Sequence, residues 1–508
     1  MSKKSTLLLF FVALKFVLQY SVISPVYELH RDEFLHLDQA KHLAWGYLSV
    51  PPFTSWISWI ILQLGNSVFW IKFFPALFGV LTIVVIWKTI EELKGNWFAL
   101  VLAAVALTFS AITRINILFQ PNSLDILLWT LLYFAILKHI NSENDKWLWV
   151  AALAFGFGFL NKYNVAFLLL GLLPALLVTE YRRLFFNRTF YWAMALAFVI
   201  ILPNLIWQYQ NSFPVFHHMQ LLAKTQLANV ERTGFLKEQL LFFFGSFFVL
   251  VAAFVSFFRY EQFKKYRVFF WSYVFTLSLF VYFRAKGYYA IGLYPILIAF
   301  GSVYLEQLLS KGWLRYLRLV SMMIPIILFI PLLRIAFPID SPEKIKQIGE
   351  RYKKYGLLRW EDGKDHIVPQ DFADMLGWIE LAAKVDRVYD SIPDKTSVIV
   401  ICDNYGQAGA INYYSKNRTM RAVSLNADYI HWFPLDHEIR NVILVTEVGD
   451  DDLKRDKERP LFKSVYLAGQ IENPFAREQG THVFVLKDAH TPVNKLILEE
   501  ISKREQEQ

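Results

Sequence analysis

Just beyond the first apolar segment, the chain reads Arg31-Asp32-Glu33-Phe34-Leu35-His36-Leu37-Asp38-Gln39-Ala40-Lys41-His42-Leu43-Ala44-Trp45-Gly46. This stretch holds two adjacent carboxylates, a flanking arginine and a lysine–histidine pair, whereas the first two thirds of the chain consist largely of Phe, Leu, Ile, Val and Trp. Ionisable groups at membrane depth are costly and usually face a cavity. The stretch therefore predicts a polar site at the end of a bundle of membrane-spanning helices.

Composition places the chain among membrane proteins. Of its 508 residues, 55% are hydrophobic and 17% are aromatic, which is more than a soluble chain of this length carries. The net charge of +9 does not indicate a nucleic-acid partner, because Lys and Arg lie in short segments between apolar runs. That pattern is typical of topology signals and of contacts with anionic lipid headgroups. The single cysteine, Cys402, excludes an intrachain disulfide.

The apolar segments predict about 11 membrane spans. A spanning helix needs about 20 apolar residues, and eleven windows between Ser5 and Phe337 meet this need. They centre near residues 15, 78, 105, 130, 155, 171, 199, 248, 275, 297 and 326. The first window follows Lys3-Lys4 without a small-residue cleavage site, so it is predicted to be an uncleaved span. The run Phe53–Leu64 predicts a short re-entrant or interfacial helix.

Basic residues predict the orientation of these spans. With a cytoplasmic N-terminus, the connections that should be basic carry Lys88, Lys94, Lys138, Lys146, Arg182, Arg183, Arg188, Arg259, Lys264, Lys265, Arg267, Lys311, Arg315 and Arg318. An odd number of spans then leaves everything after about Pro338 outside the cytoplasm. The pattern predicts a multi-pass protein of the inner (plasma) membrane whose site and C-terminal part are extracytoplasmic.

Residues 339–508 predict a second domain of α/β class, because charge rises and apolar spans cease. Two amphipathic helices and three buried strands are expected at Ser341–Tyr355, Asp371–Ile392, Ser397–Cys402, Val442–Thr446 and His482–Leu486. The chain is therefore divided into a transmembrane catalytic domain, 1–338, and a soluble extracytoplasmic domain, 339–508.

Asp32 and Glu33 are the first candidate site residues. Between Asp32 and Leu48 the apolar residues fall on one helical stripe, which predicts a helix that lies in the membrane interface. Both carboxylates would occupy its first turn, where the helix dipole favours the ionised form, so that Asp32 could act as a base. The alternative is that Asp32 caps the helix and that Glu33 is a solvated neighbour.

Further charged residues lie at the same, predicted extracytoplasmic ends of the spans. Lys286, Arg284, Lys162 and His42 could bind a phosphate group, since cationic side chains serve phosphate as point charge or fork. The alternative for Lys286 is a lysine that reaches to lipid headgroups. Asp125 begins a span, where it is either an N-cap or a second carboxylate that orients an acceptor or helps to place a divalent ion. A long loop, 208–238, is predicted on the same side.

Six stretches carry a resemblance to a known family. They are Arg31–Phe53, Phe119–Leu131, Gly158–Tyr163, Leu202–Gln208, Lys286–Pro295 and Asn404–Ala410. On these stretches the chain resembles bacterial members of the GT-C superfamily, in the glycosyltransferase family 39 or protein O-mannosyltransferase-like group. It is more distantly similar to the lipid A aminoarabinose transferases.

The resemblance implies a GT-C fold, a catalytic carboxylate in the first extracytoplasmic loop, a polyprenyl-phosphate sugar donor and an inverting displacement. It assigns the base to Asp32 with Glu33 as its partner, a second carboxylate to Asp125 and a phosphate contact to Lys286. The lipid A transferases have a Glu-Lys pair before their paired prolines, whereas Ser49-Val50 stand there in this chain. The phosphate contact is therefore expected from Lys286, Arg284 or Lys162. The family is mixed in its use of metal ions, so the resemblance implies no particular metal and leaves a divalent cation open.

These observations predict an integral-membrane glycosyltransferase whose acceptor is a glycolipid, a cell-envelope glycan or a protein hydroxyl. The alternative is a transporter or flippase for a lipid-linked sugar, in which the charged loops line a route instead of a reaction site. Transporters often show two matching halves, and no such internal symmetry is visible in the sequence.

Overall fold

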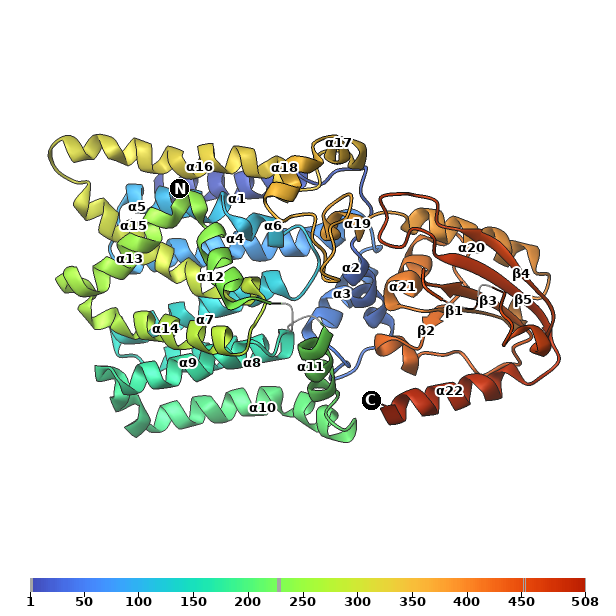
Figure 1. Cartoon of the computed structure of the whole chain (residues 1–508). Coiled ribbons are helices and arrows are strands. Elements are labelled where there is room, and N and C mark those ends of the chain that lie inside the picture. The colour runs from blue at the N-terminus through green and yellow to red at the C-terminus, as the bar shows by residue number, and fades with distance from the viewer. Residues whose placement is uncertain (1–2, 226–229, 451, 453, 508) are drawn as a thin grey trace.

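The structure, a computed structural model, describes residues 3–225, 230–450, 452 and 454–507. The N-terminal two thirds form a bundle of helices, and an α/β unit packs against one end of this bundle (Figure 1). The helices of the bundle and of its connections are α1 (Lys3–Ser21), α2 (Arg31–Asp38), α3 (Phe53–Gln63), α4 (Val68–Glu92), α5 (Trp97–Thr108), α6 (Ala111–Ile115), α7 (Asn122–Ser142), α8 (Lys146–Asn161), α9 (Val165–Leu177), α10 (Arg188–Gln210), α11 (Pro214–Thr225), α12 (Arg232–Leu241), α13 (Phe247–Arg259), α14 (Arg267–Tyr282), α15 (Tyr294–Leu308) and α16 (Leu317–Ala336).

The bundle is built from apolar helices. By length and composition, six helices among the described residues can cross a membrane, and eight can do so if each of two bent helix pairs counts as one span. Two further apolar helices, α5 and α8, are shorter. Each of the eleven predicted windows falls on a helix, but several of these helices are shorter than the about 20 residues that a straight span needs. The number of eleven spans therefore stays a prediction.

The C-terminal unit is a mixed sheet covered by helices. Its elements are α17 (Pro342–Gln347), α18 (Gly349–Lys354), α19 (Gln370–Ala373), α20 (Trp378–Ser391), β1 (Val398–Cys402), α21 (Tyr405–Tyr414), β2 (Ala422–Ser424), β3 (Asn441–Thr446), β4 (Phe462–Gln470), β5 (His482–Ala489) and α22 (Val493–Glu507). The strand order is β2-β1-β3-β5-β4. β1 is parallel to both of its neighbours, with Val400 opposite Ala422 on one side and Ile443 on the other, whereas β5 is antiparallel to β3 and β4. The predicted class, a helical membrane protein with a C-terminal α/β domain, is confirmed.

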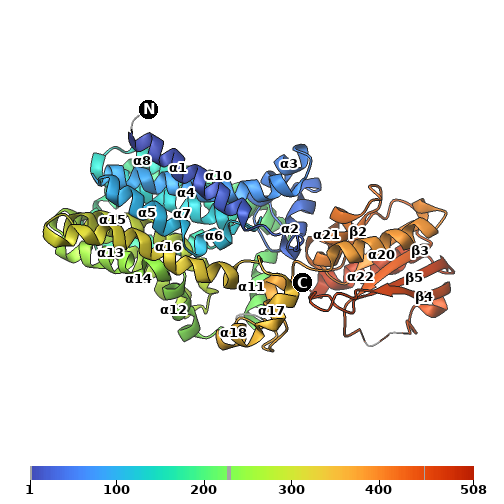
Figure 2. The same ribbon diagram turned by 90° about the horizontal axis from the view of Figure 1, so that it is seen from above.

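The two parts share a hydrophobic core. One apolar cluster joins Phe34 and Leu37 of α2 to Trp378 of α20 and Ile411 of α21. In both views α21 lies between α2 and the sheet (Figures 1 and 2). The first polar stretch of the chain is therefore held between the helix bundle and the α/β unit.

Several predicted boundaries were wrong for local reasons. The interfacial helix expected from Asp32 to Leu48 ends much earlier, since α2 stops at Asp38 and only one 3₁₀ turn, Gln39–Lys41, follows it. The Tyr47 hydroxyl donates to the carbonyls of Gln39 and His42, which fixes the chain in a turn there.

Two other expected elements are divided. The helix expected at Asp371–Ile392 is split into α19 and α20 at Gly377, whose φ of +88° interrupts a helix. The helix expected at Ser341–Tyr355 is likewise split, at Ile348. The long loop predicted at 208–238 is mostly helical in its described part, because α10 ends at Gln210 and α11 and α12 follow. Residues 226–229 of that loop lie outside the described residues.

Candidate active site

Helix α2 begins with a reciprocal cap that fixes the direction of its first turn. The His30 imidazole accepts a hydrogen bond from the backbone N–H of Asp32, at 3.2 Å, and the Glu33 carboxylate accepts one from the backbone N–H of His30, at 2.9 Å. Such a capping box satisfies donors that a helix start otherwise leaves unpaired. The two adjacent carboxylates are therefore held on a rigid helical turn.

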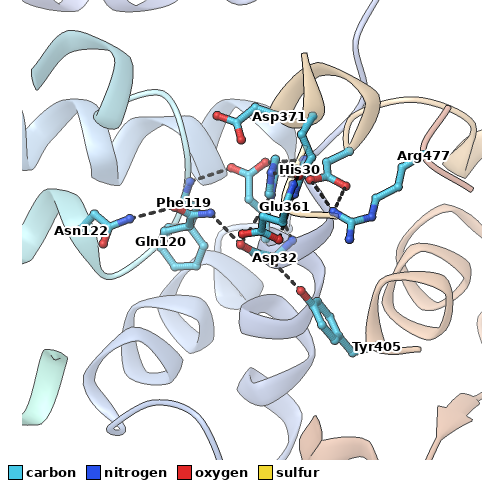
Figure 3. Close-up of polar contacts among 12 residues, drawn as sticks. His30, Asp32, Phe119, Gln120, Asn122, Glu361, Asp371, Tyr405 and Arg477 are labelled. Carbon is cyan, nitrogen blue, oxygen red and sulfur yellow. Dashed lines mark hydrogen bonds and ion pairs between the residues drawn. The ribbon is translucent and has the colours of Figure 1, made fainter. Parts of the chain in front are cut away.

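Asp32 lies at the junction of the two domains with both carboxylate oxygens engaged. Oδ2 accepts from the Gln120 amide, at 2.9 Å, and Oδ1 accepts from the Tyr405 hydroxyl, at 2.7 Å (Figure 3). The side chain keeps 37% of its surface exposed, so a substrate can reach it. Burial raises the pKa of Asp32, but His30, the hydrogen bond from Tyr405 and the charge of Arg31 outweigh it and hold the pKa of this carboxyl below its usual value. Asp32 is therefore an ionised, reachable carboxylate.

A row of hydrogen bonds joins Asp32 to Lys162. Gln120 donates to Asp32 and accepts from the Asn122 amide, at 2.9 Å, and Asn122 in turn accepts from the Lys162 ammonium group, at 2.6 Å. The Lys162 nitrogen also lies 4.2 Å from the centre of the Tyr289 ring. The side-chain amides of Gln120 and Asn122 therefore lie between the Asp32 carboxylate and the Lys162 ammonium group.

Lys286 lies in the same region and is paired with a carboxylate from the loop between α18 and α19. Its ammonium group is 3.0 Å from Glu361, and its charge also acts on Lys162. Burial raises the pKa of Glu361, but Lys286 outweighs this and lowers the pKa below its usual value. Lys286 is 24% exposed and Glu361 39%, so the pair can open toward solvent.

Asp125 belongs to this region through Lys162 and not through Asp32. It is buried in the first turn of α7, where one oxygen accepts from the Asn164 amide, at 3.0 Å, and the charge of Lys162 acts on the carboxylate. Its other oxygen, Oδ1, has no hydrogen-bond partner among the described residues. Asp125 and Lys162 are thus near enough for their charges to act on each other, although no ion pair joins them.

Glu33 points into the protein and not into the site. Its carboxylate is fully buried and accepts two hydrogen bonds from Lys72, at 2.7 and 2.8 Å, besides those from the backbone N–H groups of Phe119, at 2.7 Å, and His30. Because successive helical residues are turned by about 100°, Asp32 and Glu33 face different surroundings. This geometry fits a residue that fastens α2 to α4 and to Phe119 in the loop before α7.

Two of the predicted phosphate ligands are not brought to Lys162 and Lys286. The Arg284 side chain is exposed and makes no hydrogen bond or ion pair with the described residues, and the His42 ring stacks on Trp432, with centroids 4.3 Å apart. Burial against this ring lowers the pKa of His42. His42 therefore contacts the α/β unit, and of the four predicted phosphate ligands Lys162 and Lys286 are the two whose charges act on each other.

Residues that sequence reasoning did not select complete the site. Gln120, Asn122 and Tyr405 contact the candidate residues directly, and all three lie in stretches on which the family resemblance rests. Their uncharged side chains gave no signal of a role. Among the described residues, no group of three or more His, Cys, Asp or Glu side chains is arranged to hold a metal ion.

Comparisons with known proteins bear on the family and the fold of the chain. Residues 49–207 match the family model of the dolichyl-phosphate-mannose-protein mannosyltransferases. Over 198 residues the chain is 27% identical to the lipid A galacturonosyltransferase RgtD of Rhizobium johnstonii, an alignment that covers 37% of this chain and 41% of that protein. The match thus spans about two fifths of the curated relative.

Solved structures extend the likeness to the whole fold. Crystal structures of ArnT from Cupriavidus metallidurans, one in the apo state and one bound to undecaprenyl phosphate, each superpose with a TM-score of 0.61 at 13% identity. The superpositions cover 97% of this chain and 99% of that protein. The fold shared with ArnT and the family match over residues 49–207 together support the predicted resemblance to the GT-C superfamily.

Proposed function

We propose that the chain is an integral-membrane glycosyltransferase, which moves a sugar from a polyprenyl-phosphate donor to a hydroxyl group of an extracytoplasmic acceptor. The observation that carries the proposal is the row from Asp32 to Lys162, which sets an ionised carboxylate apart from two neighbouring cations. The donor class is supported by the bound undecaprenyl phosphate of the ArnT structure and by the family match.

The chemistry is a single displacement at the anomeric carbon of the sugar. Asp32 takes the proton of the acceptor hydroxyl, whose oxygen forms the new bond to the anomeric carbon while the bond to the phosphate oxygen breaks. Lys162 and Lys286 stabilise the negative charge of the departing polyprenyl phosphate. With base and cations at opposite ends of the row, the sugar lies between them, and attack opposite the leaving group inverts the configuration. Asn122 keeps Lys162 in place, the charge of Asp125 acts on Lys162, and Glu33 keeps α2 in place.

The distribution of basic connections supports the proposed side of the membrane. Lys138 pairs with Glu92, at 2.6 Å, and Lys265 donates to Asn141, at 2.9 Å, so these connections meet at the far ends of α4 and α7. The candidate site lies at the opposite ends of the same helices. Because basic connections remain in the cytoplasm, the site and the α/β unit face outward from the inner membrane.

Reconstitution tests the function. Purified protein in liposomes is supplied with radiolabelled polyprenyl-phosphate sugars and a crude envelope acceptor. A transferase releases polyprenyl phosphate and labels a glycolipid, an envelope glycan or a protein. If the labelled donor crosses the bilayer chemically unchanged and no acceptor is labelled, the chain is a flippase and the proposal is wrong.

We expect Glu361→Gln to lower the KM for the donor. In the resting site Glu361 neutralises Lys286, and a donor phosphate has to replace it. Partly exposed ion pairs contribute up to about 1 kcal/mol, so the KM should fall by up to about five-fold with kcat nearly unchanged. The matched control is Asp362→Asn in the same turn, since Asp362 pairs with His366 and not with Lys286. A KM that rises in Glu361→Gln would mean that Glu361 contributes to donor binding.

A further inference from the structure

Among the described residues, Tyr405 makes the one hydrogen bond from the α/β unit to the carboxylate of Asp32. It is the first residue of α21, and its hydroxyl donates to Oδ1 of Asp32 at 2.7 Å. The Arg31 guanidinium lies 4.7 Å from the centre of the Tyr405 ring. The ring is therefore held by a cation on one side, with its hydroxyl directed at the carboxylate (Figure 3).

A buried network holds the backbone of Tyr405 in place. The preceding residue, Asn404, caps α21 by accepting from the backbone N–H of Gln407, at 3.0 Å. Its amide nitrogen donates to Glu447, at 2.6 Å, and to Glu478, at 3.1 Å, and Glu478 is 5% exposed. These carboxylates lie after β3 and before β5, so the start of α21 is tied to the sheet and not to a free loop.

Close packing then fixes α21 against α2. A Cβ atom on Gly409 would lie 2.5 Å from the Phe34 Cβ, so only glycine allows this approach. On the same interface Glu28 accepts hydrogen bonds from the first backbone N–H groups of α20, at 2.6 and 3.0 Å. The position of the Tyr405 hydroxyl relative to Asp32 is therefore set by a rigid domain interface.

The topology of the sheet also places Tyr405 at an edge where ligands commonly bind. β1 has parallel neighbours on both sides, and α21 starts at the carboxyl end of β1. In sheets of this kind, ligands bind outside the carboxyl ends of the strands, at the point where the strand order reverses. Here that edge faces Asp32, and Tyr405 projects from it.

We propose that Tyr405 is a positioning residue for Asp32, and that the α/β unit thereby forms the wall of the active site opposite Gln120. This inference rests on the role proposed for Asp32. With one oxygen bound by Gln120 of the membrane domain and the other by Tyr405, the carboxylate cannot rotate. A base held in one orientation meets the acceptor hydroxyl without reorganisation. The acceptor then lies between the membrane domain and the carboxyl edge of β1 and β3.

The bond from Tyr405 also keeps Asp32 ionised, because a hydroxyl that donates to a carboxylate stabilises its charged form. Asp32 is faced by charged or titratable groups from α2, from the residue after α19, from the segment before α15 and from α21, namely His30, Arg31, His36, Asp374, Tyr288 and Tyr405. Tyr405→Phe removes one stabilising contact and leaves the other groups in place. The pKa of Asp32 then rises. As the solution is acidified, Asp32 therefore becomes protonated, and can no longer act as a base, at a higher pH than in the wild type.

The test compares Tyr405→Phe with Tyr413→Phe. Tyr413 is on the same helix, and its hydroxyl donates across the same interface to the carbonyl of Asn66, at 3.0 Å, without touching Asp32. The first measurement is labelling of Asp32 by a water-soluble carbodiimide with an amine nucleophile, followed across acidic pH by peptide mass spectrometry. The protonated carboxyl is the form that reacts, so the midpoint of labelling should move to higher pH in Tyr405→Phe and stay unchanged in Tyr413→Phe.

The second measurement is the pH profile of sugar transfer. In Tyr405→Phe the acidic limb should move to higher pH, and kcat above this limb should fall by up to about a hundred-fold, since misplacing a reacting group by about 1 Å costs that much. The KM for the donor should stay unchanged, because the phosphate cations are untouched.

The two measurements separate this inference from the proposed function. Equal labelling midpoints in wild type and Tyr405→Phe would overturn the role of Tyr405, whatever the transfer assay gives. A shifted midpoint in a protein that transfers no sugar from any donor would uphold the contact with Asp32 and overturn the glycosyltransferase.

Discussion

Asp32→Asn should abolish sugar transfer while the protein remains folded and inserted in the membrane. An amide of the same shape keeps a hydrogen bond to Tyr405 but cannot take a proton from the acceptor hydroxyl. Removal of a general base lowers kcat by about 10²- to 10⁴-fold. The measurement is release of polyprenyl phosphate by wild type and variant in the same liposomes, with donor binding measured separately to show that the cations still function.

Asp371→Asn is the matched control for this variant. Asp371 is 62% exposed and pairs with Arg114, at 3.2 Å, so it supplies a nearby carboxylate that contacts neither Asp32 nor the row to Lys162. It should retain nearly full activity. Full activity in Asp32→Asn would show that Asp32 is not the base, and Asp125 would then be the next carboxylate to test.

Lys72→Met should destabilise the protein more than any substitution at its surface. The variant leaves the Glu33 carboxylate buried without its counterion, and breaking a buried ion pair from one side costs about 3 to 5 kcal/mol. The expected result is a clear fall in the unfolding temperature. The measurement is thermal unfolding of the protein in detergent, with and without added lipid. Lys41→Met, which breaks a partly exposed pair with Asp38, should cost much less.

The double variant Glu33→Gln/Lys72→Met separates a structural role of Glu33 from a catalytic one. It removes both charges, so most of the lost stability should return. If Glu33 serves only to fasten α2, this double variant transfers sugar at a rate near that of wild type. A stable double variant without activity would show that Glu33 takes part in the reaction as the partner of Asp32.

The sequence made the general class predictable, and it singled out candidate residues for the site. Asp32 stands out because a carboxylate beside an apolar span is costly, and Lys162 and Lys286 stand out because positive charge there opposes the topology bias. The strands at residues 397–402, 442–446 and 482–486 were predicted because buried apolar runs of that length suit few other elements. β2 and β4 were missed, since β2 is three residues long and β4 is mostly exposed along its length.

The contacts of the site were not predictable to the same extent. Which loop cations come near one another depends on tertiary packing, so sequence position alone did not distinguish Arg284 and His42 from Lys162 and Lys286. Glu33 is different, because helical geometry already implies that it faces away from Asp32. Tyr405 lies 373 residues from Asp32 in the chain, and no periodicity or charge pattern joins two residues at that distance.

The core that α2 shares with α20 and α21 has a consequence for biosynthesis. The chain is made from its N-terminus, so α2 leaves the ribosome long before Trp378 and Ile411, against which Phe34 packs. Until those residues arrive, the apolar face of α2 has no partner and Asp32 lacks the hydroxyl of Tyr405. A chain whose translation stops before the α/β unit therefore has every apolar helix of the bundle. Its Asp32 carboxylate has the hydrogen bond from Gln120 but not the one from Tyr405. Synthesis of the C-terminal α/β unit is therefore the step that completes the contacts of Asp32 in a chain already inserted in the membrane.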